Sequence, residues 1–147
     1  MKPPPVANRR WLFFLPGCSM ARTILIIEDD QIARTGLATV LESFGYDTFS
    51  ARNAQEAVEG LRCFTPDLIL MDMIMPGGDG WTFFGHRNQD TVLASIPVVV
   101  MTGLGISSEE WARSLGAVAF LRKPFEVDYL LETVRRWIEP RTAGAGA

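Results

Sequence analysis

The sequence predicts one α/β domain in which a five-stranded parallel sheet is covered by helices on both faces, a doubly wound arrangement. Two observations carry this prediction. Between residues 21 and 139, five short apolar segments alternate with five segments of helical periodicity, an order that indicates consecutive βα units. The strand segments are continuously apolar rather than alternating, which is typical of strands buried on both faces.

Turn and cap residues delimit the elements of the first half. Strands are predicted at 23–27, 46–51 and 67–72. A helix is predicted over 30–45, where Gly45 provides the left-handed C-cap. A second helix is predicted over 53–64, with Asn53 as N-cap and Pro66 as the stop.

The second half repeats the pattern after a loop at 73–80 that is rich in glycine and proline. Strands are predicted at 97–103 and 117–122, and helices at 81–89, 107–116 and 126–139. Ser107 or Ser108 is the expected N-cap of the helix at 107–116. Pro140 is expected to end the last helix.

Both ends of the chain differ in composition from this body. Residues 1–20 hold a proline run, two arginines and a short apolar stretch. They are predicted to be a disordered extension, or a stretch ahead of Met20 as the true initiator methionine. A docking arm and an export signal are the alternatives. The apolar stretch is shorter than the roughly 7–15 apolar residues of an export signal. Residues 140–147 are predicted to form a flexible tail, which leaves 21–139 as the domain.

Composition excludes several classes of protein. Of 14 basic and 17 acidic residues, four basic ones precede Glu28, so the rest of the chain has a net charge of −7. An anionic body is unsuited to nucleic acid. No apolar run approaches the roughly 20 residues of a membrane-spanning helix. Two cysteines form no disulfide framework, and a single histidine, His86, excludes multi-histidine metal sites.

Polar side chains follow four of the five predicted strands, at the sheet edge where ligands of open α/β sheets bind. They are Glu28, Asp29, Asp30, Asp72, Thr102, Arg122 and Lys123. Taken singly, each has an ordinary explanation as a helix cap, a turn residue or a solvated charge. Together, converging carboxylates repel one another unless a hard cation such as Mg²⁺ compensates them. A cation, a lysine and a hydroxyl at one edge indicate phosphoryl chemistry.

Four motifs give this pattern a family resemblance. The segments LIIEDD, DLILMDMIMPGGDGW, PVVVMTG and FLRKPF resemble those of the response-regulator receiver domain, the phospho-acceptor half of bacterial two-component signalling. The resemblance covers residues 21–139. It implies a flavodoxin-like (βα)5 fold with strand order 2-1-3-4-5 and a cytoplasmic protein.

The resemblance also implies the roles of the acidic residues. Asp72 matches the phosphorylated aspartate. Glu28 and Asp29 match the acid pair that holds Mg²⁺ (or Mn²⁺), with Asp72 and the backbone carbonyl of Met73 as further ligands. Glu28 stands where the family more commonly has aspartate.

The remaining matched residues concern the phosphoryl group and the switch. Thr102 matches the hydroxyl that bonds the phosphoryl group, and Lys123 the lysine that pairs with its oxygens. The bond between Lys123 and Pro124 matches a peptide that is usually cis. Phe120 matches the aromatic switch residue, which is expected to turn inward when Thr102 moves; it lacks the hydroxyl of a tyrosine.

By this resemblance, the protein accepts a phosphoryl group from a histidine kinase or a histidine phosphotransfer protein and catalyses only its own phosphorylation and dephosphorylation. A face formed by the fourth helix (107–116), fifth strand (117–122) and fifth helix (126–139) is expected to bind a downstream target, in a monomer or a weak dimer. No output domain is expected. Ile74 and Leu104 are expected to flank the line of water attack and slow hydrolysis of the phosphoryl group.

Three other functions compete with this one. A haloacid-dehalogenase-type phosphatase needs an acid where Ile74 stands. A flavodoxin-like cofactor binder needs a phosphate-cradling loop where the acids at 28–30 stand. The serious alternative is a receiver-like module that binds proteins or oligomerises without being phosphorylated.

Overall fold

The computed structural model describes residues 21–75, 79–103, 105 and 108–146, with residues 79 and 139–146 described by their backbone alone. The predicted extension at 1–20 lies outside the described residues. Five strands form one parallel sheet in the order β2-β1-β3-β4-β5, which confirms the predicted topology. The strands are β1 (Thr23–Ile27), β2 (Asp47–Ala51), β3 (Leu68–Asp72), β4 (Val98–Thr102) and β5 (Ala119–Arg122).

Six helices lie within the described residues. They are α1 (Gln31–Ser43), α2 (Ala54–Leu61), α3 (Asp79–Asn88), α4 (Thr91–Ala94), α5 (Glu109–Leu115) and α6 (Val127–Gly146). The predicted fourth and fifth helices therefore correspond to α5 and α6. In this part of the chain, none of the helices is long and apolar enough to cross a membrane.

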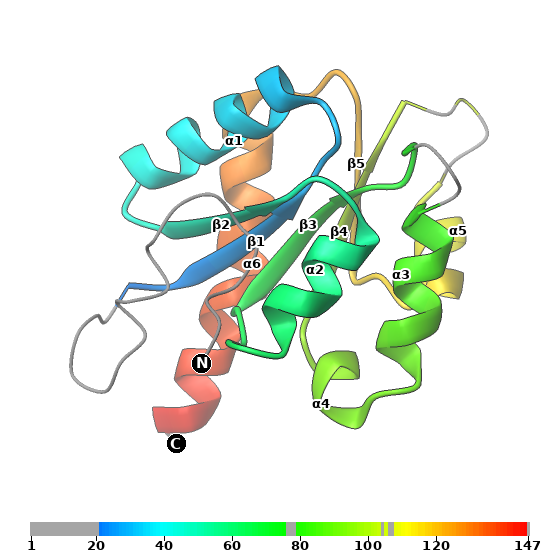
Figure 1. The fold of residues 1–147 in the computed structure, drawn as a ribbon. Coiled ribbons are helices and arrows are strands. Elements are labelled where there is room, and N and C mark those ends of the chain that lie inside the picture. Colours follow the sequence, from blue (N-terminus) through cyan, green and yellow to red (C-terminus); the bar gives the residue numbers. More distant parts are fainter. Residues whose placement is uncertain (1–20, 76–78, 104, 106–107, 147) are drawn as a thin grey trace.

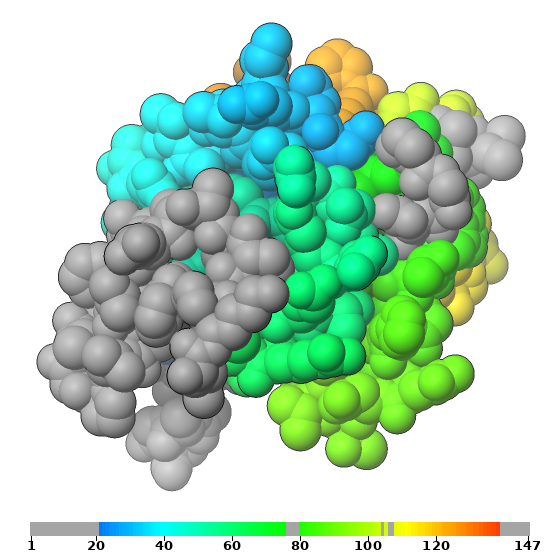
Figure 2. Space-filling model, viewed as in Figure 1, coloured from blue at the N-terminus to red at the C-terminus, as the bar shows by residue number. Residues whose placement is uncertain are grey.

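Two apolar clusters hold the helices on opposite faces of the sheet. Ile24 and Ile26 of β1 pack in one cluster with α1 and α6. The alternate residues, Leu25 and Ile27, belong to the other cluster, which α2, α3 and α5 cover. In Figure 1, α6 lies behind the sheet and α2 in front of it, and Figure 2 shows α2 and α3 side by side over the front face. The strands are apolar throughout because both of their faces are buried.

Side-chain caps and left-handed glycines set several helix ends where the sequence predicted them. The Asn53 side chain accepts a hydrogen bond from the third residue of α2 at 2.8 Å. Ser108 caps α5 in the same way at 3.1 Å. Gly45 (φ 96°) follows α1, and Gly116 (φ 108°) follows α5. Glycine tolerates this left-handed backbone, so each helix ends there without strain.

The last helix is longer than predicted. A helix end at Pro140 with a tail beyond it was expected, but α6 continues through Pro140 to Gly146. Proline in a helix removes one backbone hydrogen bond and crowds the preceding turn. That penalty disfavours a helix without forbidding it. A proline is therefore a weaker stop signal than we assumed.

The short helix α4 was not predicted at all. The Asp90 side chain caps it by accepting hydrogen bonds from two N–H groups of its first turn at 2.9 and 3.1 Å. At its other end, Arg87 of α3 donates from Nη2 to the carbonyls of Ala94 and Ile96 at 2.9 and 2.8 Å. Four residues show no helical periodicity, so α4 is stabilised by these side chains and has no signature in the apolar pattern.

Candidate functional site

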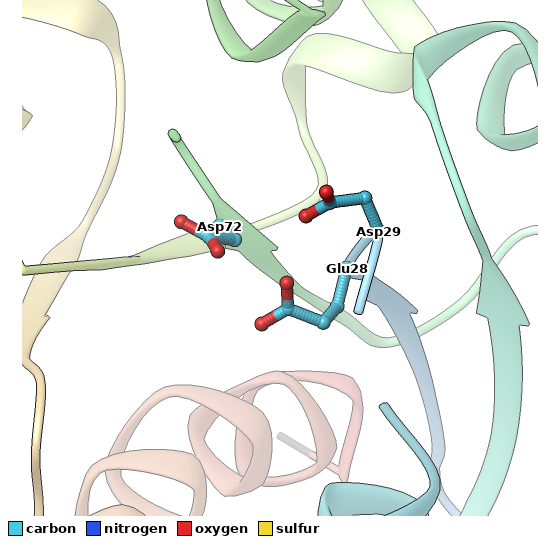
Figure 3. Close-up of side chains that lie close together, drawn as sticks. All are labelled: Glu28, Asp29 and Asp72. Atoms are coloured by element: carbon cyan, nitrogen blue, oxygen red, sulfur yellow. The ribbon is translucent and has the colours of Figure 1, made fainter. Parts of the chain in front are cut away.

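Three carboxylates converge at the carboxyl edge of the sheet. Asp72 ends β3, and Glu28 and Asp29 directly follow the neighbouring strand β1, whose last residue Ile27 pairs with Met71. One carboxylate oxygen from each of the three lies within 4.8 Å of the others. Figure 3 shows the three side chains close together, with those of Glu28 and Asp29 extending toward the side on which Asp72 lies. The predicted acidic cluster is therefore formed by the fold.

Lys123, which is remote from these residues in the sequence, forms hydrogen bonds to two of the three carboxylates. It follows β5, and its Nζ donates to Glu28 Oε1 at 2.8 Å and to Asp72 Oδ2 at 2.9 Å. Glu28 is only 1% exposed and Asp72 only 6%, whereas Asp29 is exposed. The lysine thus sits as a counter-ion between two buried acids, where bulk water screens the charges poorly.

Asp72 also contacts the backbone that follows it. The Ile74 N–H donates to Asp72 Oδ1 at 2.9 Å. One oxygen of Asp72 therefore faces this N–H and the other faces Lys123. The carboxylate is held in a fixed direction by donors on both sides.

Burial and like charge make Glu28 a weak acid. Burial, opposed by the hydrogen bond and charge of Lys123 and aided by the neighbouring Asp72, raises the pKa of Glu28 from 4.5 to about 7. Burial alone would lower the pKa of Lys123, but its hydrogen bonds to Glu28 and Asp72 and their negative charges outweigh that, so its pKa is raised. The site therefore keeps the lysine charged and holds more negative charge than one lysine neutralises.

The donor set fits a hard divalent cation. Carboxylate oxygens from Glu28, Asp29 and Asp72 lie close enough to share an ion, and Mg²⁺ prefers oxygen ligands of this kind together with several waters. Asp29, the exposed member, leaves one side of the cluster open to solvent. An ion of charge +2 would balance the excess negative charge that Lys123 leaves.

Thr102 and Phe120, the other predicted site residues, lie on β4 and β5. Thr102 is fully buried at the end of β4, one residue beyond Met101, the register partner of Asp72. Its carbonyl accepts a hydrogen bond from the Lys123 N–H at 2.9 Å. Phe120 is already 9% exposed, so an inward turn on activation would start from a ring that is largely buried.

The two backbone features implied by the resemblance lie beside the acids. The peptide bond between Lys123 and Pro124 is cis. Met73 is fully buried, and its N–H donates to the Met101 carbonyl at 3.1 Å. Ile74 is exposed; its expected companion in slowing hydrolysis, Leu104, lies outside the described residues.

Sequence reasoning missed one residue that packs against the backbone of Met73, namely Gly80 of α3. A Cβ added to Gly80 would lie 2.9 Å from the Met73 carbonyl oxygen and 3.0 Å from its Cα. Backbone atoms cannot swing aside as a flexible side chain does, so only glycine allows α3 to approach Met73 this closely. Its position in a Gly-rich loop signals a turn and hides this packing role.

We expect Gly80→Ala to destabilise the protein by about 1–3 kcal/mol, the usual cost of overpacking. The matched control is Gly85→Ala on the same helix, because a Cβ there meets nothing within 4 Å. That control should stabilise the protein by roughly 0.5–1 kcal/mol, since alanine favours a helix interior over glycine. Urea unfolding of both variants measures the two changes. Equal effects of the same sign would show that Met73 does not restrict residue 80.

The fold and site together define a doubly wound α/β protein with a cluster of carboxylates at one edge of its sheet, and comparisons with known proteins give the family. The response regulator receiver domain family matches residues 24–135. The phosphate regulon transcriptional regulatory protein PhoB of Escherichia coli is 37% identical over 126 residues, which cover 82% of this chain and 55% of PhoB. This chain thus spans about half the length of that relative.

Two further comparisons cover nearly the full length of the chains that they match. The polar-differentiation response regulator DivK of Brucella anthropi is 32% identical over 120 residues, 81% of this chain and 98% of DivK. The receiver domain of a Pseudomonas aeruginosa sensor histidine kinase, solved with magnesium coordinated in its active site cleft, has a TM-score of 0.73 at 26% identity and covers 80% of this chain and 98% of that one. The chain belongs to the response regulator receiver domain family of two-component signalling.

Proposed function

We propose that the protein receives a phosphoryl group on Asp72 from a phosphohistidine of a histidine kinase or histidine phosphotransfer protein, in a reaction that depends on Mg²⁺ or Mn²⁺. One observation carries this proposal: the buried Asp72 carboxylate accepts a hydrogen bond from the Lys123 ammonium at 2.9 Å and lies within 4.8 Å of carboxylate oxygens of Glu28 and Asp29. Nucleophile, cation and cation-binding acids thus meet at one edge of the sheet.

In the proposed reaction, an Asp72 oxygen forms a bond to phosphorus while the bond from phosphorus to the histidine nitrogen breaks. The electron pair of that bond leaves with the imidazole, and Asp72 becomes an acyl phosphate. A carboxylate is a modest nucleophile, so fixed geometry and charge neutralisation supply the rate. The Ile74 N–H and Lys123 orient Asp72, and Lys123 then pairs with a phosphoryl oxygen.

The metal ligands in this proposal are Glu28, Asp29, Asp72 and the backbone carbonyl of Met73. When bound, the ion neutralises phosphoryl oxygens as they approach the acids. Burial holds the Glu28 and Asp72 side chains in place. Asp29, in contrast, faces solvent. Beyond transferring this group to and from itself, no catalysis is proposed.

The proposed switch links Asp72 to the face formed by α5, β5 and α6, where a downstream target would bind. Thr102 bonds the phosphoryl group, and its shift alters the packing of Phe120, a population shift driven by the new charge. A groove of about 170 Å³ on this face is lined by Phe120, Arg113 of α5 and Tyr129 of α6. The place of Phe120 in the wall of this groove supports the proposal, because repacking of its ring would change the shape of the groove.

We also propose that the protein acts as a stand-alone regulator, with residues 21–139 as its receiver domain. Its proposed oligomeric state is a monomer or a weak dimer. DivK supports it, since 98% of that response regulator is covered by the match. The competing proposal is a receiver-like module that binds partners without being phosphorylated.

Incubation with acetyl phosphate and Mg²⁺ tests the proposal. Intact-mass spectrometry should detect the gain of one phosphoryl group, and peptide mapping after borohydride reduction should locate it at Asp72. Omitting Mg²⁺ or adding a chelator should prevent the gain. A chain that stays unmodified, both with this donor and with phosphorylated histidine kinases, would favour the non-phosphorylated module.

Mg²⁺ should stabilise the protein more at pH 8 than at pH 6. Because the pKa of Glu28 is raised from 4.5 to about 7 in the folded protein, the stability that its proton contributes is present at low pH and is lost as pH rises through 7. Metal binding needs the deprotonated carboxylate, so affinity falls as Glu28 gains its proton. Saturating Mg²⁺ at 100 times its Kd would add about 2.7 kcal/mol.

Urea unfolding with and without Mg²⁺ at the two pH values measures this difference. In the series without Mg²⁺, Glu28→Gln, which has no proton to lose at this position, is the control and should flatten the dependence of stability on pH. Equal stabilisation of the parent protein at pH 6 and pH 8 would contradict the prediction.

A further inference from the structure

Arg34 connects the turn that carries the acid pair to helix α1. Its Nη1 donates to the Glu28 carbonyl oxygen at 2.7 Å and approaches the Asp29 carbonyl oxygen at 3.4 Å. Helical side chains lean toward the N-terminus of their helix, and Arg34, in the first turn of α1, therefore reaches back over the residues that precede it. One guanidinium nitrogen thus contacts the backbone of both acids.

These contacts complete the restraint on the Glu28 backbone. Its N–H donates to the Ala51 carbonyl at the end of β2 at 3.0 Å, and its carbonyl is bound by Arg34. Glu28 lies just beyond the last residue of β1, where the strand no longer dictates direction. The sheet therefore holds the N–H of Glu28, and Arg34 holds its carbonyl group.

The direction of this turn matters because consecutive side chains of a strand point to opposite faces. Glu28 and Asp29 are consecutive, yet their carboxylates both lie within 4.8 Å of Asp72 and of each other. The chain must therefore leave strand geometry at Glu28, and it must do so in one particular way. The Arg34 contacts fall on the two peptide groups that make this change.

We propose that Arg34 is a positioning residue for the metal site, which fixes the turn so that the carboxylates of Glu28 and Asp29 converge. This inference rests on the proposed function, because the converging carboxylates are the ligands proposed there. Residues that orient metal ligands without touching the ion typically contribute about 10–100-fold to metal affinity. We expect Arg34 to contribute an effect of that size.

Charge alone predicts the opposite effect, which makes the inference testable. Removing a cation from the neighbourhood of a dication site reduces repulsion and strengthens metal binding. Arg52 offers the matched comparison. It is an exposed cation whose Nη2 and Nε donate to Glu56 of α2 at 2.6 and 2.9 Å. Burial raises the pKa of Glu56, but the hydrogen bonds and charge of Arg52, together with the charge of Arg34, outweigh burial and lower it. Both arginines therefore act on the same carboxylate.

The test is calorimetric titration of the full chain with MgCl₂ at pH 8, without a phosphodonor. Arg34→Met should weaken Mg²⁺ binding by roughly 10–100-fold. Arg34→Lys, which keeps the charge and can reach one carbonyl, should fall between that variant and the parent. Arg52→Met should bind Mg²⁺ as the parent does or more tightly. Urea unfolding without Mg²⁺ shows whether each variant is folded.

The outcomes separate the two proposals. If the parent binds Mg²⁺ and Arg34→Met binds it equally well, the positioning role is wrong while the proposed function stands. If Arg34→Met is less stable but retains parental affinity, Arg34 is structural only. If it does not fold, Arg34→Lys decides, and parental affinity in that variant overturns the inference. If the parent itself binds no Mg²⁺, the proposed metal dependence fails, and the positioning role fails with it.

Discussion

Replacing Asp72 with asparagine should abolish phosphorylation of the protein by acetyl phosphate or by a phosphorylated histidine kinase. The amide is nearly isosteric with the carboxylate but has no anionic oxygen with which to attack phosphorus. Asp72 is 6% exposed and is held by Lys123 and the Ile74 N–H, so we expect no other acid to replace it. Intact-mass spectrometry after a fixed incubation measures the loss.

Asp30→Asn is the control for this experiment. Asp30 lies two residues beyond Glu28, is exposed, and caps α1 through its side chain. Asparagine caps a helix about as well as aspartate, so this variant makes the same change of charge near the site and preserves the fold. It should be phosphorylated like the parent. Phosphorylation of Asp72→Asn at the parental rate would place the acceptor elsewhere.

Replacing Lys123 with methionine should slow phosphorylation by roughly 10²–10³-fold, the cost of removing one preorganised donor to a developing charge. In the structure, Lys123 is bonded to both Asp72 and the nearly inaccessible Glu28. Methionine retains the length of the side chain and loses the ammonium. The incoming phosphoryl oxygens would then approach buried acids without this counter-charge, and the rate of mass gain would report the effect.

Mg²⁺ binding separates this loss from general damage to the site. The three carboxylates remain in Lys123→Met, so the variant should still bind Mg²⁺ in a calorimetric titration. Arg62→Met, which removes an exposed cation at the end of α2, should be phosphorylated at the parental rate. An unchanged rate for Lys123→Met would show that its charge does not assist the transfer.

Local patterns in the sequence predicted much of this fold. The apolar runs at Thr23–Ile27 and Leu68–Asp72 are strands as expected, because burial on both faces leaves a continuous signature. Asn53 and one of the two candidate serines cap helices as expected. Where a local signal was weak, prediction failed: α4 has only four residues, and Pro140 does not end α6.

The strand ends also determined which residues meet at the sheet edge. Parallel strands deliver their carboxyl ends to one side, so Glu28, Asp72 and Lys123 were placed together before any distance was known. The family resemblance assigned roles to these residues, and the family match supports the kind of protein. The roles themselves remain predictions that the variants above test.

The amino-acid sequence by itself thus determined the βα order, the helices on both faces and the polar groups at one edge, because these depend on local periodicity and on the topology of parallel strands. Only the tertiary structure decided that Lys123 bridges Glu28 and Asp72 across 95 and 51 residues, that the pKa of Glu28 rises to about 7, and that Arg34 and Gly80 hold the backbone of the site. Distance, burial and close packing arise between segments remote in the chain, and no local pattern encodes them.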